Sequence, residues 1–261
     1  MRMTDMADEL FRGPETELPA GVRLATAKRG GVTVTRVEIA REGLARPRGR
    51  YVTLEMPSVS VLDERDTDVI ETGAAELRAL LPPEGPVLVL GIGNRRVTAD
   101  ALGPRTAQKI LVTMGPQHTL PVRGIRPVAA LAPGVSGDTG LTLRQLAAAM
   151  VDAVRPAALI CVDSLCSAEA ARLGRTIQFS DTGLHPADAR HARHLDAAAL
   201  GVPVIAAGIP TLMDADEGAD LVLTPRALDS VIAHGSALLA GILNRALQPR
   251  LSVAQLCWLT G

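Results

Sequence analysis

The chain has 261 residues, of which 47% are hydrophobic and 2% are aromatic, and its formal net charge is −1. Such a chain can bury one large core, so we expect a single domain. Mixed acidic and basic residues offer no charged surface for nucleic acid or for an anionic membrane, and the scarcity of aromatic rings excludes a base-stacking platform.

The first third of the chain predicts a polar leader, two strands and a helix. Residues 1 to about 30 are polar and contain Gly and Pro breakers, so we expect a loosely held leader. Residues 32–39 and 50–56 alternate between apolar and polar with period two, which predicts two half-exposed antiparallel strands. Apolar residues at helical spacing predict a helix over 66–81, which ends before two prolines.

The remainder alternates apolar strands with amphipathic helices. We predict strands at 86–91, 126–131, 157–162, 176–179, 203–206 and 221–223, and helices at 100–113, at 142–154 and from Pro225 onward. The apolar stretch 228–247 carries Asp229, His234, Asn244 and Arg245, which predicts a buried helix and not a bilayer span. The predicted fold class is α/β: a three-layer sandwich with a mostly parallel sheet, helices on both faces and an N-terminal β-hairpin extension, phosphorylase/hydrolase-like.

The cysteines and the amino terminus predict the compartment. Cys161, Cys166 and Cys257 are odd in number, and Cys161 lies in a predicted buried strand, so we expect a reducing environment without a disulfide framework. The acidic amino terminus lacks the apolar segment of a signal peptide. We therefore expect a cytoplasmic protein.

Two aspartates stand where predicted strands end. Asp100 follows the turn Gly91-Ile92-Gly93-Asn94, and Asp163 follows the strand 157–162. Open α/β sheets gather catalytic groups at the carboxyl ends of their strands. Two neighbouring carboxyls share a proton, so one can activate water while the other protonates a leaving amine. Helix capping by Asp100 and a capped turn at Asp163 are the structural alternatives.

Other residues offer weaker signals. The Gly-rich turn after the strand 86–91 has Val97 in place of the third glycine of a dinucleotide loop, which disfavours nucleotide binding. His185 could complete a metal site with the two aspartates, or it could bond to backbone in a turn held by Asp181 and Gly183. Ser136 and Cys166 are poor nucleophile candidates, because neither has a histidine partner assigned to it.

These motifs together resemble the germination protease family of spore-forming bacteria. The resemblance rests on Gly91-Ile92-Gly93-Asn94 with 97–104, on Ala132-Pro133-Gly134-Val135, on Val162-Asp163, on 176–178 with 180–186, on 200–206 and on Gly208-Ile209-Pro210-Thr211.

The resemblance implies an aspartic-type endopeptidase that degrades small acid-soluble spore proteins after acidic residues. The family's functional aspartates fall on Asp100 and Asp163, and we assign substrate-binding or supporting roles to Asn94, Gly134, Asp181 and His185. The fold resembles that of the hydrogenase-maturation peptidases, which bind nickel through acids at similar places. We expect no cofactor; the alternative is a divalent metal on Asp100, Asp163 and His185.

The family is made as a zymogen that removes its own leader. The matching position here is the bond between Asp5 and Met6, so residues 1–5 would be a propeptide and residues 6–261 a single α/β peptidase domain. The expected location is the cytoplasm of the forespore or the spore core. Family members assemble as tetramers, but this chain lacks their long segment between Ala215 and Leu221, which leaves a homo-oligomer open.

Two other functions remain as hypotheses. One is a metal-dependent maturation-type peptidase, which a chelator would inactivate. The other is a non-catalytic relative that binds an acidic peptide without cutting it.

Overall fold

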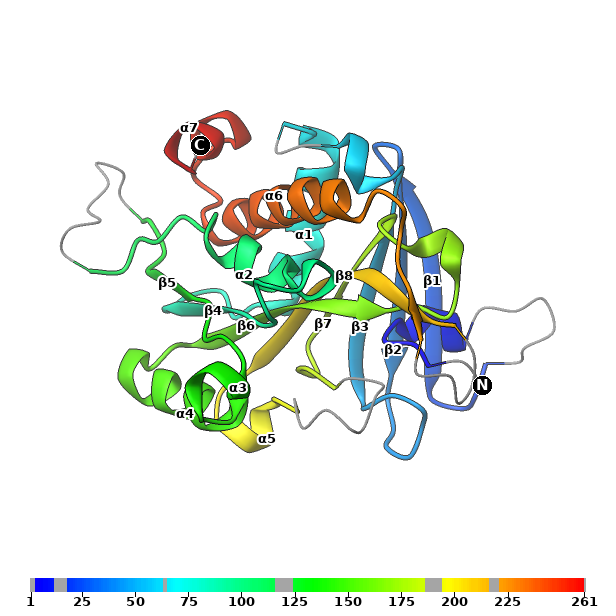
Figure 1. The fold of residues 1–261 in the computed structure, drawn as a ribbon, viewed down its shortest axis with the longest axis horizontal. Coiled ribbons are helices and arrows are strands. Elements are labelled where there is room, and N and C mark those ends of the chain that lie inside the picture. The colour runs from blue at the N-terminus through cyan, green and yellow to red at the C-terminus, as the bar shows by residue number, and fades with distance from the viewer. Residues whose placement is uncertain are drawn as a thin grey trace.

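The computed structural model describes residues 3–11, 18–62, 65–115, 124–185, 194–215 and 221–260, which form a mixed sheet flanked by helices (Figure 1). The strands are β1 (Val22–Arg29), β2 (Val32–Ile39), β3 (Gly49–Glu55), β4 (Val87–Gly91), β5 (Val128–Leu131), β6 (Ala158–Cys166), β7 (Thr176–Ser180), β8 (Val204–Asp214) and β9 (Val222–Leu223). The helices are α1 (Thr67–Leu80), α2 (Leu102–Ala107), α3 (Ser136–Thr139), α4 (Leu143–Val154), α5 (Ala197–Leu200), α6 (Leu228–Leu247) and α7 (Val253–Thr260). Short 3-10 helices are η1 (Ala7–Leu10), η2 (Val59–Val61), η3 (Thr98–Asp100) and η5 (Ala170–Arg172).

The sheet joins a parallel half to an antiparallel half. Its strand order is β1-β2-β3-β7-β8-β6-β4-β5, with β9 paired to β8. Strands β8, β6, β4 and β5 run parallel, whereas β1, β2, β3 and β7 pair antiparallel and β7 joins β8 antiparallel. The predicted α/β class is confirmed. The sheet is mixed, because the predicted hairpin extension is part of a larger antiparallel unit.

Helices cover both faces of the parallel half, as predicted (Figure 1). On one face, α1, α2 and α6 close the main core around Leu77, Ile160 and Leu239. On the other face, α4 packs over Leu90 and Leu159. Strand β4 is buried along its whole length, and this burial on both faces explains why its sequence is continuously apolar.

The prediction of a loose leader up to residue 30 is wrong. Met6 and Ala7 are fully buried, and η1 packs against the antiparallel half of the sheet. Strand β1 pairs with β2 from Val22 to Arg29. Most of β1 is exposed at the sheet edge, and only Val22 and Leu24 carry large apolar side chains, an alternation too short to reveal a strand.

The helix predicted over 100–113 is shorter than expected. Helix α2 ends at Ala107. Beyond it, a side chain of α6 forms hydrogen bonds with backbone groups that would otherwise bond within a longer helix. The Asn244 amide oxygen accepts from the Leu111 N–H at 2.8 Å, and its nitrogen donates to the Lys109 carbonyl at 2.9 Å. A side chain 130 or more residues away therefore replaces helical hydrogen bonds, which no local pattern could indicate.

Strands β6 and β8 are longer than predicted. Their pairing continues past the end of β4, from Leu159 opposite Val204 to Cys166 opposite Leu212. The predicted helix over 142–154 is confirmed as α4, which begins with a capping box formed by Thr142 and Gln145.

Helix α6 begins at Leu228, three residues after the predicted start, and is followed by α7 at the carboxyl end. Among the described residues, α6 alone is long and apolar enough to cross a membrane, and 67% of its apolar window is buried inside the protein. The prediction of a buried helix therefore agrees with its packing between α1, α2 and α7 (Figure 1). Residues 216–220, where the resemblance implies a longer segment, lie outside the described residues.

Candidate active site

The Asp100 carboxylate is held over the turn that follows β4. Its Oδ2 accepts a hydrogen bond of 2.8 Å from the Asn94 N–H, and the Asp100 N–H donates to the Val97 carbonyl at 2.9 Å. The buried Thr211 hydroxyl of β8 donates to the Ala99 carbonyl at 2.9 Å, which ties η3 to the sheet. Asp100 is half-buried, so solvent or a substrate can reach it.

Glycines allow this close approach of η3 and α2 to the sheet. Gly93 has φ +123°, and a Cβ there would lie 2.0 Å from the Asp100 carbonyl oxygen and 3.0 Å from its Oδ1. A Cβ on Gly103 would lie 2.3 Å from the carbonyl oxygens of both Ile92 and Val162. Glycine at these positions is therefore a steric requirement for placing Asp100 at the end of β4 and β6.

Asp163 lies within β6, not beyond it as predicted, because β8 continues alongside. Its side chain is buried, with 4% exposed. Its Oδ1 accepts a hydrogen bond of 2.8 Å from the Ser164 N–H. Gly208 of β8 lies directly opposite, and a Cβ there would lie 2.3 Å from the Asp163 carbonyl oxygen. The Leu165 side chain also packs against this position, with Cγ 2.7 Å from where a Cβ would lie, so only glycine fits beside Asp163.

The fold brings Asp100 and Asp163 to the same end of neighbouring strands. Strand β4 pairs with β6 up to Gly91 opposite Val162, and the Ile92 N–H donates to the Val162 carbonyl at 2.8 Å. Asp163 thus follows the last β6 residue that pairs with β4, and Asp100 lies in η3, beyond the end of β4. One is buried and one is half-exposed, so their surroundings differ, as a division into acid and base requires.

Asn94 and Gly134 lie in the loops beside the aspartates. Asn94 shapes its own turn, since its Oδ1 accepts from the Arg96 N–H at 2.9 Å. Gly134, with φ +79°, follows β5 and leads into α3. An exposed ion pair of 3.3 Å between Arg96 and Asp138 connects the two loops.

Asp181 and His185 support a turn on the antiparallel side. Both carboxylate oxygens of Asp181 accept from Arg50, at 2.7 Å from its N–H and 2.7 Å from its Nε. His185 Nε2 lies 2.9 Å from the Thr182 carbonyl, and its Nδ1 lies 3.2 Å from His194 Nδ1. Burial lowers the pKa of His185, and neighbouring His194 lowers it further.

The structure does not assemble Asp100, Asp163 and His185 into a common site. Within the part of the chain that the structure describes, no three His, Cys, Asp or Glu side chains are grouped so that they could hold a metal ion. His185 instead bonds to backbone in the turn, which is the alternative that the sequence left open.

Burial makes Cys161 and Cys166 poor nucleophiles. It raises the pKa of the Cys166 thiol to about 12, with a further contribution from Asp5. It also raises the pKa of the Cys161 thiol, where the negative charge of Asp163 adds to the effect. Neither forms a thiolate readily near neutral pH.

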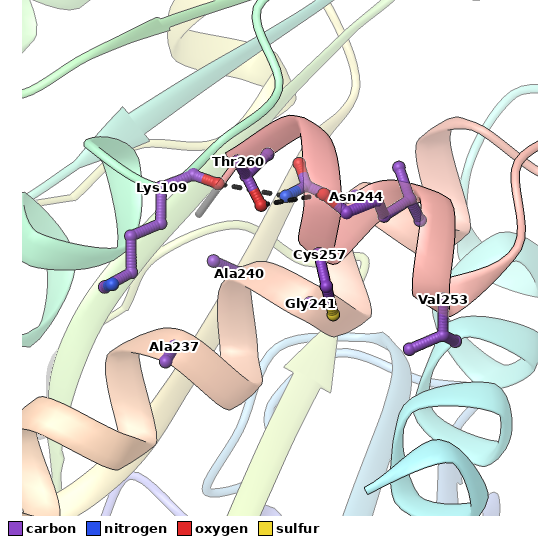
Figure 2. A pocket seen from close by; sticks show the side chains of 9 residues that line it. Lys109, Ala237, Ala240, Gly241, Asn244, Val253, Cys257 and Thr260 are labelled. Carbon is purple, nitrogen blue, oxygen red and sulfur yellow. Dashed lines mark hydrogen bonds between the residues drawn. The ribbon is translucent and has the colours of Figure 1, made fainter. Parts of the chain in front are cut away.

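A pocket also lies away from the aspartates, between α6 and α7 (Figure 2). Ala240, Gly241 and Asn244 of α6 face Leu256 and Cys257 of α7 across it. None of the predicted site residues lines it.

Sequence reasoning missed the residues that hold the amino-terminal segment. Asp5 and Met6 lie inside the fold, in contact with Gln178 of β7 and with Arg46 in the loop between β2 and β3. Arg172 of η5 binds the next two acids, Asp8 and Glu9. Only Gln178 lay within a recognised motif; the two arginines gave no local signal.

Comparisons with known proteins identify related chains. The germination protease family model matches residues 4–217. The germination protease of Clostridium perfringens (strain SM101 / Type A) is 32% identical over 278 residues, which cover 84% of this chain and 86% of that protein. The germination protease of Caldanaerobacter subterraneus subsp. tengcongensis is 40% identical over 224 residues, which cover 80% of this chain and 67% of that protein. A crystal structure of the NiFe hydrogenase maturation protease HycI from Thermococcus kodakarensis KOD1 aligns with TM-score 0.43 and 18% identity over 66% of this chain and 98% of that one.

Proposed function

The chain belongs to the germination protease family, and from this we propose an aspartic-type endopeptidase that degrades small acid-soluble spore proteins after acidic residues. Family membership makes the chain a peptidase. The aspartic mechanism is supported by one observation: Asp100 and Asp163 lie at the same end of the neighbouring strands β4 and β6. We place this activity in the cytoplasm of the forespore or in the spore core.

The proposed reaction is hydrolysis of a peptide bond by water. One aspartate, as its carboxylate, accepts a proton from the water while the water oxygen adds to the carbonyl carbon. The other, as its acid, gives a proton to the departing nitrogen when the carbon–nitrogen bond breaks. The base gains one proton from the water and the acid loses one to the nitrogen, so the pair remains singly protonated with the two roles exchanged.

The closing test of this assignment is substitution of each aspartate by its amide. We expect Asp100→Asn and Asp163→Asn each to lower kcat for cleavage of an acid-soluble spore protein by roughly 100-fold or more, because a general acid or base is lost. Asp152→Asn, at an exposed position on α4, is the matched control and should keep the wild-type rate. Wild-type cleavage by either amide variant would refute the paired-aspartate mechanism.

We also propose that the reaction needs no metal ion, which is supported by the separation of His185 from the aspartates into a backbone-bonded turn. Cleavage should persist after dialysis against a chelator. Loss of cleavage that returns with one divalent metal would favour the metal-dependent peptidase instead.

Self-processing between Asp5 and Met6 is the remaining part of the proposal. The bond lies beside the side chain of Gln178, on a segment whose polar groups are held by the fold. Incubated protein should gain a species that begins at Met6, detected by intact mass, and Asp163→Asn should not form it. A wild-type chain that keeps its original amino terminus under conditions that cut the spore protein would contradict self-processing.

A further inference from the structure

Residues 3–7 lie in the fold as a bound peptide would. The Asp5 N–H donates to the Cys166 carbonyl at 2.8 Å, which adds one strand-like hydrogen bond at the carboxyl end of β6. Met6, the next residue, has an extended backbone with φ −81° and ψ 110°. An extended peptide that bonds to the end of a strand is a common mode of peptide recognition.

The Asp5 side chain occupies a site built for a carboxylate. Its Oδ2 accepts from the Cys166 N–H at 2.7 Å, and its Oδ1 lies 3.4 Å from Arg46 Nη2. Arg46 is buried, with 8% of its side chain exposed. Its Nη1 donates to the His185 carbonyl at 2.7 Å, so this contact fixes the guanidinium independently of Asp5. A buried, oriented cation favours an acidic residue over its neutral amide.

Gln178 holds the backbone on both sides of the Asp5–Met6 bond. Its Nε2 donates to the Asp5 carbonyl at 2.9 Å, and its Oε1 accepts from the Ala7 N–H at 2.7 Å. These are backbone contacts, so they would form with any sequence in the same extended conformation. Gln178 therefore positions the peptide. Arg46 Nη2 also donates to the Thr4 carbonyl, and its charge selects the side chain.

The same row of the sheet carries Gln178 and Asp163. Asp163 lies opposite Gly208, and Gly208 lies opposite Gln178, so all three are on one face. Neighbouring strands are about 4.8 Å apart, which places the Gln178 backbone roughly 10 Å from that of Asp163. Gly208 itself places no side chain between them, and the Leu165 side chain packs over it, with Cγ 2.7 Å from where a Cβ would lie.

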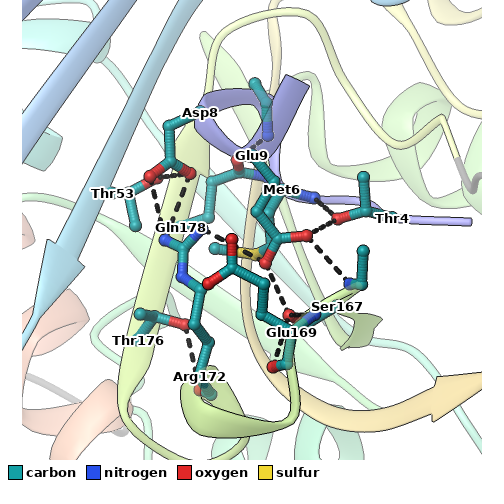
Figure 3. Close-up of polar contacts among 12 residues, drawn as sticks. Thr4, Met6, Asp8, Glu9, Thr53, Ser167, Glu169, Arg172, Thr176 and Gln178 are labelled. Atoms are coloured by element: carbon teal, nitrogen blue, oxygen red, sulfur yellow. Dashed lines mark hydrogen bonds and ion pairs between the residues drawn. The ribbon is translucent and has the colours of Figure 1, made fainter. Parts of the chain in front are cut away.

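Downstream of this bond, a buried ionic cluster anchors the chain (Figure 3). Arg172 Nη2 lies 2.9 Å from Asp8 Oδ2, and its Nη1 lies 3.1 Å from Glu9 Oε1. The Thr53 hydroxyl donates to Asp8 Oδ1 at 3.0 Å. The segment is thus held on both sides of the Asp5–Met6 bond.

We propose that Arg46, Gln178 and the Cys166 backbone form a peptide subsite selective for an acidic residue, which residues 3–7 occupy in cis. The occupant in trans is an extended peptide with Asp or Glu at the position of Asp5. Only the statement that this peptide is then cut rests on the proposed function; the binding stands separately.

Protection of the Cys166 thiol measures occupancy, because its Sγ contacts the Met3 carbonyl and its N–H contacts Asp5. In the full chain carrying Asp5→Ala, alkylation of Cys166 should be faster than in the wild type. A synthetic peptide with the sequence of residues 1–9 should slow it again. The same peptide with Asn only at the position of Asp5 should need a roughly tenfold higher concentration for the same protection, because it loses a charge-assisted hydrogen bond.

The selectivity depends on Arg46. Adding Arg46→Met to Asp5→Ala should remove the difference between the two peptides, whereas adding Arg23→Met, at an exposed arginine of β1, should preserve it. Equal protection by both peptides, or protection by neither up to millimolar concentration, would overturn the subsite. Selective protection without any cleavage of spore protein would retain the subsite and refute the proposed function.

Discussion

The residue that most directly controls the position of Asp100 is Gly93. Its φ of +123° is unfavourable for other residues, and a Cβ would lie 2.0 Å from the Asp100 carbonyl oxygen. We expect Gly93→Ala to displace η3, to lower the free energy of unfolding by about 1–3 kcal/mol, and to lower peptidase activity more than the stability loss explains. Urea unfolding and cleavage rates on the same samples measure the two effects.

A second glycine separates backbone strain from the contact with Asp100. Gly31, in the turn between β1 and β2, has φ +78° but no atom within 4 Å of the position of a Cβ. Gly31→Ala should therefore cost roughly 1 kcal/mol of stability for its backbone conformation and leave the cleavage rate unchanged. Equal effects of the two substitutions on activity would show that Asp100 does not depend on Gly93.

At the scale of elements, η1 and η5 are joined by a buried ion-pair cluster. Arg172, 4% exposed, faces Asp8 and Glu9, whose side chains are 1% and 3% exposed. Arg172→Met would leave two carboxylates buried without their cation, and we expect it to lower the free energy of unfolding by about 3–5 kcal/mol. Chemical denaturation monitored by circular dichroism measures this loss.

An exposed pair provides the matched control for this cluster. Arg23 lies 3.7 Å from Glu38 across β1 and β2, with 85% and 54% of the side chains exposed. Arg23→Met should change stability by no more than about 1 kcal/mol, because water screens the pair. A loss from Arg172→Met as small as that from Arg23→Met would mean that water reaches the cluster.

The elements that the sequence predicted are those whose signal is local. Strand β4 is continuously apolar because both of its faces are buried, and α4 has both apolar spacing and a capping box. Strand β1 was missed because its residues are largely exposed at an edge. The end of α2 was missed because it depends on Asn244, a residue of a distant helix.

At the scale of the whole molecule, the sequence likewise predicts some residues of the candidate site and not others. Asp100 and Asp163 could be selected because parallel strands of an α/β sheet bring their carboxyl ends together whatever the loops do. The residues that bind the amino-terminal segment could not be predicted from the sequence. Arg46, Arg172 and Gln178 lie 41, 163 and 171 residues from the groups that they bind. Local periodicity carries no information about contacts at such separations.

The three cysteines differ in how deeply the fold buries them, and this difference predicts the order in which they are alkylated. Cys257 on α7 is half-buried; Cys166 lies behind the amino-terminal segment; Cys161 is fully buried in β6. Native protein treated with iodoacetamide at mildly alkaline pH should react first at Cys257, then at Cys166 as the segment detaches, and at Cys161 only through global unfolding. Mass spectrometry after digestion reads each site. Arg172→Met should increase the alkylation rate of Cys166, because the amino-terminal segment loses its anchor. It should increase the alkylation rate of Cys161 only by the factor that the variant's loss of global stability predicts. Simultaneous reaction of Cys166 and Cys161 in the wild type would mean that the segment opens only when the whole sheet does.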